Sequence, residues 1–202
     1  MANEHYFSAN PESELKLRTI RTKLAGRDVE VTTANGVFSP ERVDIGTQVL
    51  LSSVPAPPPG GHLLDLGCGW GPIALTLALE SPHATVWAVD VNERSLDLVR
   101  RNAAALGLTN VNAVLPADVP DDISFMTIWS NPPIRVGKDE LHNLLRTWLP
   151  RLDQATDAWL VVARNLGSDS LQRWIETEFA SVLTVTRVAL NKGFRVMRVR
   201  KR

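Results

Sequence analysis

Cysteine is nearly absent from this sequence of 202 residues, and other features that mark whole classes of protein are missing too. The single cysteine, Cys68, excludes a disulfide bond within the chain. No stretch approaches the roughly 18 consecutive apolar residues of a membrane-spanning helix. Residues 1–5 are polar and lack the apolar segment of a signal peptide. These absences predict a cytoplasmic protein that does not cross a membrane.

Two common nucleotide-binding motifs and any metal-ligand pattern are also missing. The glycine-rich stretch at 67–71 does not complete the dinucleotide fingerprint G-x-G-x-x-G, because Pro72 stands where the third glycine belongs. No phosphate loop of the form G-x-x-x-x-G-K-[ST] occurs. The four histidines show no ligand spacing with the one cysteine, so we expect no metal site.

The net charge is zero, but basic residues gather toward the end of the chain. The stretch 187–202 contains seven Lys and Arg residues and no acid. Such a stretch suits the phosphates of a nucleic acid. Alternatively, its cations keep an edge strand from aggregating. The hydrophobic content of 44% and charged content of 22% are typical of one globular domain.

A proline-rich stretch at 55–61 separates an N-terminal segment, 1–54, from a core, 55–202. In the N-terminal segment, alternation at 29–33 and a helical pattern at 40–53 predict a small cap. In the core, apolar stretches alternate with helical patterns, which predicts a doubly wound α/β fold with a parallel sheet. The predicted strands are 62–66, 85–89, 111–115, 125–130, 158–163, 182–190 and 194–200, and the predicted helices are 72–80, 93–106, 138–149 and 168–179.

The last two predicted strands are joined by only three residues, 191–193. This connection is too short for a parallel crossover, so the two strands must form an antiparallel hairpin. We therefore predict a mostly parallel, seven-stranded sheet that closes with a C-terminal antiparallel hairpin.

The strand predicted at 62–66 runs into the glycine turn at 67–71, and Pro72 then suits the first turn of a helix. Glycines let the backbone approach a ligand closely, and a helix N-terminus offers amide donors. Asp90 ends the next strand about twenty residues later, where a carboxylate can accept from both hydroxyls of a ribose. Asp118 follows the third strand and either reads an adenine amino group or forms a turn between prolines.

Asn131-Pro132-Pro133-Ile134 ends the strand at 125–130 abruptly, because neither proline donates a ladder hydrogen bond and both fix φ. The result is a stiff ledge that presents the amide of Asn131 and the carbonyl of Pro132. These acceptors suit an –NH2 group. Alternatively, the prolines only end the strand in a loop.

The pattern D-x-G-x-G-x-G from Asp65 to Gly71, Asp90, Asp118 and the late Asn131-Pro-Pro together resemble class I S-adenosylmethionine-dependent methyltransferases. Within this class the chain resembles the methyltransferase-small family, which includes the small-subunit rRNA guanine-N2 methyltransferases. Five segments resemble that family in the same order along the chain, and they are 4–8, 36–39, 43–47, 130–138 and 192–196.

The resemblance implies S-adenosyl-L-methionine as cofactor and RNA as partner. It assigns cofactor binding to Asp65, Gly67, Cys68, Gly69, Gly71, Asp90, Val91, Asp118 and Asn131. It assigns the transfer itself to Asn131, Pro132, Pro133 and Ile134. It assigns substrate binding to Phe38, Arg135, Lys138, Lys192 and Arg195. Gly46 and Thr47 are expected to close over the cofactor or the target base.

The Asn131 ledge suits methyl transfer to the exocyclic amine of guanine. That amine is a poor nucleophile, because its lone pair is delocalised into the ring. If the side-chain oxygen of Asn131 and the carbonyl of Pro132 accept its two N–H bonds, a pyramidal nitrogen is favoured and developing positive charge is stabilised. We therefore predict a methyltransferase acting on guanine N2 of small-subunit (16S) rRNA, free or within a ribosomal subunit.

Two alternatives stay open. The same ledge could methylate N5 of a glutamine in a release factor or ribosomal protein, or the chain could be a cofactor-binding scaffold without activity. Many amine methyltransferases carry an aromatic residue after the two prolines, which stacks on the target base. Ile134 stands there instead, which argues against adenine or glutamine as target. The sequence leaves the oligomeric state open.

Overall fold

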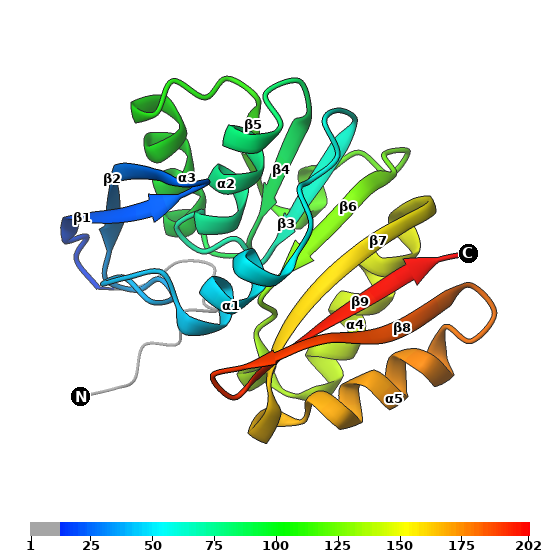
Figure 1. The fold of residues 1–202 in the computed structure, drawn as a ribbon. Helices are drawn as coiled ribbons and strands as arrows, with labels where there is room; N and C mark the ends of the chain where they lie inside the picture. Colours follow the sequence, from blue (N-terminus) through cyan, green and yellow to red (C-terminus); the bar gives the residue numbers. More distant parts are fainter. Residues whose placement is uncertain (1–12) are drawn as a thin grey trace.

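The computed structural model describes residues 13–202, except for the side chain of Arg135. A seven-stranded sheet forms its centre, with helices on both faces (Figure 1). The strands of this sheet are β3 (His62–Leu66), β4 (Thr85–Val89), β5 (Val111–Val114), β6 (Phe125–Ser130), β7 (Leu152–Ala163), β8 (Leu183–Asn191) and β9 (Phe194–Lys201). The helices are α1 (Ile45–Ser53), α2 (Pro72–Glu80), α3 (Glu93–Ala105), α4 (Lys138–Trp148) and α5 (Ser168–Glu178). None of these described helices has the length and apolar composition that crossing a membrane requires.

The strand order is β5-β4-β3-β6-β7-β9-β8, and every neighbouring pair from β5 to β7 is parallel. Strand β9 runs antiparallel to both β7 and β8, which confirms the predicted C-terminal hairpin. The chain passes from β3 to β4 on one side and later returns to β6 on the other side. In parallel α/β sheets, such a reversal opens a crevice at the carboxyl ends of the strands. Ser130 Oγ donates to the carbonyl oxygen of Leu66 at 2.7 Å and joins the two strand ends there.

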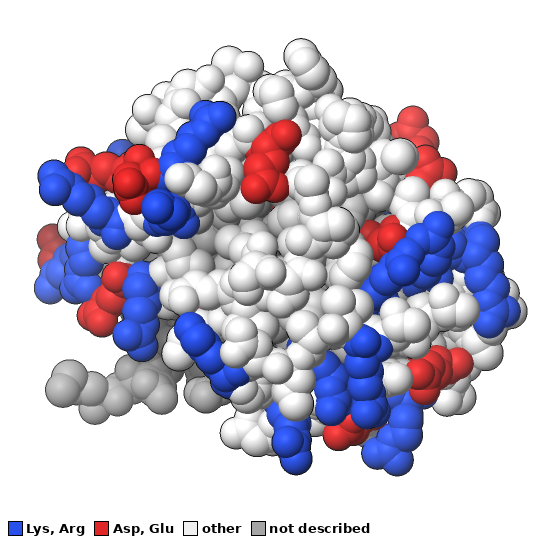
Figure 2. Space-filling model, in the orientation of Figure 1, with Lys and Arg blue, Asp and Glu red and all other residues white. Residues whose placement is uncertain are grey.

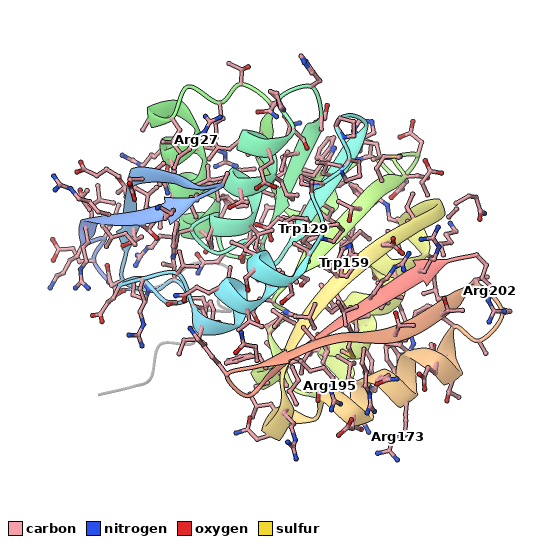
Figure 3. The ribbon with its side chains drawn as sticks, viewed as in Figure 1. Arg27, Trp129, Trp159, Arg173, Arg195 and Arg202 are labelled. Atoms are coloured by element: carbon pink, nitrogen blue, oxygen red, sulfur yellow. The ribbon has the colours of Figure 1, made fainter. Side chains whose placement is uncertain are left out.

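Two clusters of buried apolar side chains hold the helices against the sheet. On one face, α4 and α5 contribute Leu145 and Ile175. On the other face, α1, α2 and α3 pack on the sheet, and Leu50 of α1 is fully buried. Trp129 of β6 and its register partner Trp159 of β7 lie on this second face (Figure 3). Each buried Leu or Ile contributes about 2 kcal/mol of hydrophobic stabilisation.

A separate two-stranded sheet precedes the main one and consists of β1 (Leu17–Leu24) and β2 (Arg27–Ala34). The sequence indicates only part of β2, at 29–33, and does not indicate β1, whose alternate charged residues face solvent. The buried side of this hairpin packs on Trp70 and Leu98.

Two predicted boundaries in the sheet and its helices are wrong by several residues. Helix α1 begins at Ile45 rather than at 40, because Asp44 caps it and the preceding residues are irregular. Strand β7 begins at Leu152 rather than at 158. Its polar first half hides the strand pattern, and its pairing with β6 is irregular next to Ala155, which has φ of +58°. The other predicted ends of the core elements agree within one residue.

One buried amide fastens the N-terminal hairpin to the core. Asn102 of α3 is 1% exposed, and its Oδ1 accepts from the backbone N–H of Thr32 at 2.7 Å. Its Nδ2 donates to the carbonyl of Thr32 at 2.9 Å and to that of Trp70 at 3.2 Å. One side chain thus satisfies three backbone groups of two segments that are far apart in the sequence.

We predict that Asn102→Ala lowers the free energy of unfolding by about 2–4 kcal/mol, because it leaves backbone donors and acceptors unsatisfied. Urea unfolding monitored by tryptophan fluorescence measures the loss. The exposed Asn112 of β5 supplies the control, since Asn112→Ala should change stability by less than about 0.5 kcal/mol. A loss below about 1 kcal/mol for Asn102→Ala would contradict this account.

Candidate active site

A cavity of about 1060 Å³ lies at the carboxyl ends of the central strands, where the strand order reverses. Its wall combines the glycine turn after β3, the end of β4, the Asn-Pro-Pro ledge after β6, and two loops from the C-terminal part of the sheet. The lining residues that matter below are Phe38, Asp44, Gly67, Gly69, Asp90, Val91, Asn131, Pro132, Pro133, Ile134, Arg164, Leu166, Lys192 and Phe194.

The glycine turn is held against β4 by its own backbone. The N–H groups of Gly67 and Cys68 both donate to the carbonyl of Val89, at 2.8 and 3.1 Å. Gly67 and Gly69 have φ of +77° and +53°, which disfavours any residue with a Cβ. A Cβ on either would also point toward the ledge or toward Phe38, at 3.9 and 4.0 Å. The turn therefore presents bare backbone to the cavity.

Asp90 is fixed at the end of β4 by two backbone donors. Its Oδ2 accepts from the N–H of Gly69 and its Oδ1 from the N–H of Asn92, both at 2.9 Å. Burial raises the pKa of this carboxyl, while the backbone hydrogen bonds oppose the shift. A carboxylate oxygen can accept more than one hydrogen bond. Both oxygens of Asp90 therefore keep acceptor capacity toward the cavity.

Asp65 lies beneath the glycine turn rather than among the residues that line the cavity. The N-cap residue of α2 is Gly71, which has no side chain to cap the helix. Asp65 supplies the cap instead, because its Oδ2 accepts from the N–H of Ala74 at 2.8 Å. Its Oδ1 is buried and has no hydrogen-bond partner among the described residues. Burial raises the pKa of Asp65 well above its usual range, and the nearby charge of Asp90 adds to the shift.

The Asn131 side chain is oriented by the segment that begins α1. Its Nδ2 donates to Asp44 Oδ2 at 3.0 Å and to Thr47 Oγ1 at 3.1 Å. A carboxylate only accepts hydrogen bonds, so the –NH2 side of the amide must face Asp44. No hydrogen bond among the described residues uses Asn131 Oδ1. This oxygen is therefore the polar atom that the side chain leaves to the cavity.

Asp44 does two things with one oxygen. Its Oδ2 also accepts from the N–H groups of Gly46 at 2.8 Å and Thr47 at 3.4 Å, which caps α1. The sequence places Asp44 in a family-like segment but indicates no role for it in the site. The signal that it does offer is the residue type, because Asp is a typical N-cap, but the helix predicted at 40–53 placed Asp44 inside it. The contact of Asp44 with Asn131 could not be read from the sequence.

The rest of the ledge has a tight local geometry. The carbonyl of Pro132 accepts from the N–H of Ile134 at 2.9 Å, and its second lone pair remains available. Ile134 is half-buried, lines the cavity and packs on the apolar cluster between the sheet, α4 and α5. The hydrogen bond at Pro132 and the packing of Ile134 therefore hold the backbone in place on both sides of Pro133.

Three further predicted residues lie on the cavity wall. Phe38 and Val91 are partly exposed, and Lys192 lies in the β8–β9 turn. Cys68 is buried under the turn, with its thiol 3.6 Å from the carbonyl of Gly69. Burial raises the pKa of this thiol, in keeping with a small apolar role.

Other predicted residues are not brought to the cavity. Asp118 is exposed in a 3-10 turn (Pro116–Asp118), and Pro116 rather than Asp118 lines the wall. Lys138 is exposed at the start of α4. Arg195 is 8% exposed and forms an ion pair with Asp169. The side chain of Arg135 and the segment 4–8 lie outside the described part of the structure. No group of three or more potential metal ligands occurs among the described residues.

Comparison with known proteins shows the family of this chain. A sequence model of the family described as methyltransferase small domain matches residues 28–198. The chain is 34% identical over 202 residues to the uncharacterized protein YbxB of Bacillus subtilis, covering 98% of this chain and 99% of that protein. It is 39% identical over 126 residues to ribosomal RNA small subunit methyltransferase C of Aeromonas hydrophila, covering 61% of this chain. The chain spans only 36% of the length of that enzyme.

The fold also matches a solved structure. A 16S rRNA guanine-N2 methyltransferase from T. thermophilus, in complex with S-adenosylmethionine and guanosine, superimposes with a TM-score of 0.81. The match covers 95% of this chain and 52% of that one, at 24% sequence identity. At that identity, the likeness concerns the fold.

We predict that Gly71→Ala destabilises the glycine turn more than a positive φ alone would. Gly71 has φ of +99°, and a Cβ there would meet Val99 Cγ2 of α3 at 3.0 Å. We expect a loss of about 2–3 kcal/mol in thermal or urea unfolding. Gly107→Ala is the matched control, because Gly107 also has a positive φ, +68°, but a Cβ there would meet no described residue beyond its chain neighbours within 4 Å. This variant should lose about 1 kcal/mol of unfolding free energy. Equal losses for the two variants would show that the contact with Val99 is unimportant.

Proposed function

The chain belongs to the methyltransferase small domain family of S-adenosylmethionine-dependent methyltransferases, and we propose that it methylates guanine N2 in small-subunit rRNA. The observation that carries the proposal is the Asn131 amide, whose –NH2 side is bound by Asp44 so that its oxygen is left to the cavity. The Aeromonas relative, which is named as a small-subunit rRNA methyltransferase, supports the choice of substrate. A substrate in small-subunit rRNA would place the activity in the cytoplasm, and we propose that location.

The residues on the cavity wall fit the cofactor. The volume of about 1060 Å³ is at the upper end of small-molecule sites, which leaves space for a nucleoside cofactor and a target base together. Asp90 keeps acceptor capacity on both oxygens, which suits the two hydroxyls of a ribose. Gly67 and Gly69 present backbone without side chains. Val91 offers an apolar surface beside Asp90 for the adenine.

When bound, S-adenosylmethionine supplies an electrophilic methyl group whose bond to sulfur breaks as the new bond to nitrogen forms. The chain's task is to hold the guanine amine in line with that methyl group, at roughly 3–3.5 Å. We propose that Asn131 Oδ1 and the free lone pair of the Pro132 carbonyl accept the two N–H bonds of the amine. This arrangement draws the nitrogen lone pair out of conjugation and toward the methyl group. It also stabilises the positive charge that develops on nitrogen.

No strong general base is required, because the methylated nitrogen is acidic and loses its proton to water. Ile134 and Phe38 supply apolar surface around the base, and Ile134 also packs against the apolar core. Asp44 and Thr47 act as positioning residues, because they fix which way the Asn131 amide points.

The proposal is tested by transfer of tritiated methyl from S-adenosylmethionine to unmethylated small subunits, naked rRNA and release factor. We expect label in rRNA, recovered as N2-methylguanosine, and a decrease of about 100-fold or more in kcat for Asn131→Ala. Affinity for the cofactor, measured by calorimetry in the same variant, separates a role of Asn131 in the transfer from a role in cofactor binding. Label only in protein would move the activity to glutamine, and cofactor binding without transfer would favour a scaffold.

We further predict that Asp44→Ala lowers kcat about tenfold, because the Asn131 amide loses the acceptor that orients it. Asp44→Asn should retain most activity, since one amide oxygen at the position of Oδ2 can accept the same three hydrogen bonds. Asp44→Ser is the matched control for helix capping, because serine caps α1 but is too short to reach Asn131. If Asp44→Ser is as active as wild type, Asp44 acts only through the stability of α1.

A further inference from the structure

Two loops form the part of the cavity rim that lies on the C-terminal half of the sheet. One follows β7 and contains Arg164 and Leu166, and the other is the β8–β9 turn with Lys192. The N–H of Arg164 donates to the carbonyl of Gly193 at 2.8 Å, so the two loops are joined. Lys192 has φ of +47°, an unusual conformation for a residue with a Cβ, and is exposed at this turn.

The cations around these loops outnumber the acids. Arg187 of β8 and Arg195 of β9 both pair with the same oxygen, Oδ1 of Asp169 at the start of α5. Figure 3 labels Arg195 on β9, next to α5. One carboxylate therefore serves two guanidinium groups, which leaves an excess positive charge.

The remaining two cations of this rim are paired with none of the acids in residues 13–202. Neither Arg164 nor Lys192 forms an ion pair within the described part of the chain. The pKa of Asp169 is lowered, first by the hydrogen bond from Arg195 and then by the charges of Arg195, Arg187 and Arg164. Arg164 thus belongs to the same electrostatic cluster. Figure 2 shows Lys and Arg side chains gathered over the lower part of the molecule, where β8, β9 and α5 lie in Figure 1.

We propose that this rim, formed by Arg164 and Lys192 with Arg187 behind them, binds the phosphates that flank the target nucleotide of an RNA strand. This inference rests on the proposed function and adds where the RNA strand on either side of the target nucleotide is bound. A base that enters a cavity from a strand must leave its own flanking phosphates at the cavity mouth. Two long, exposed cationic side chains at that mouth match this charge. A glutamine side chain is uncharged, whereas every nucleotide in an RNA strand brings a phosphate of its own to this rim.

The rim also offers an apolar contact for a neighbouring nucleotide. Leu166 lines the cavity and is 41% exposed, although a leucine usually lies inside a fold. It is two residues from Arg164, so a phosphate bound by Arg164 would place the adjoining base or sugar within its reach. Asp90 and the glycine turn occupy other parts of the wall, which leaves the C-terminal rim to the substrate.

The test is the salt dependence of RNA binding, measured by fluorescence anisotropy with a fluorescein-labelled, single-stranded oligoribonucleotide that contains guanosine. The variant Arg164→Gln/Lys192→Gln removes two charges from exposed side chains. We expect affinity to fall about tenfold at 0.1 M salt. The slope of log K against log salt should become less steep by about 0.7 for each phosphate that the variant no longer neutralises. Melting curves establish whether the variant proteins remain folded.

The control is Lys23→Gln/Arg27→Gln on the β1–β2 hairpin, which removes the same charge from exposed residues that do not line this cavity and form no ion pair with another described residue. A decrease in affinity confined to the rim variant supports the proposal. Equal decreases in both variants, an unchanged slope, or no salt-dependent binding by the wild type would overturn it. Methyl transfer to unmethylated small subunits and naked rRNA is recorded separately. Salt-dependent binding through the rim without transfer to either of these substrates would refute the proposed function and leave the rim assignment standing.

Discussion

One carboxylate oxygen, Oδ2 of Asp44, accepts three hydrogen bonds that the site depends on. Two of them come from the backbone of α1 and fix the start of that helix. The third comes from the Asn131 side chain, which lies 87 residues further along the chain. The orientation of a single amide therefore depends on the docking of the N-terminal segment against the sheet. If the Asn131 amide were rotated by half a turn, its –NH2 group would face the cavity in place of its oxygen. The side chain would then donate a hydrogen bond where an amine substrate needs an acceptor.

Burial of the carboxyl groups of Asp65 and Asp90 disfavours their charged form. Burial raises the pKa of both, so the folded chain holds a proton at these groups more tightly than the unfolded chain does. Their contribution to stability is therefore complete at low pH and declines as pH rises through the folded-state pKa. Both acids nevertheless accept hydrogen bonds from backbone N–H groups. Each has a local task, since Asp65 caps α2 and Asp90 holds the glycine turn.

Much of the fold could be predicted because the core strands are short apolar runs bounded by strong turn residues. Gly67–Gly71 and the two prolines after Asn131 marked the ends of β3 and β6, and the three-residue turn at 191–193 required a hairpin. Strand β1 and the first half of β7 were missed because their exposed sides are charged or polar. The contact of Asp44 with Asn131 and the position of Arg164 on the rim arise from tertiary packing, which no local pattern encodes. The same holds for Arg195, whose pairing with Asp169 depends on how α5 lies against β9.

Phe194 of β9 lies so close to the first turn of α1 that a Cβ on Gly46 would meet its ring at 2.9 Å. The cavity wall thus brings together segments near residue 40 and near residue 194, with nearly the whole chain between them. Contacts of such long sequence separation form late in folding, because the entropy of closing the intervening loop must be overcome first. During synthesis, the glycine turn and the Asn131 ledge are made long before the β8–β9 hairpin that completes the wall. The wall of the cavity is therefore complete only once the residues of the β8–β9 hairpin have been synthesised.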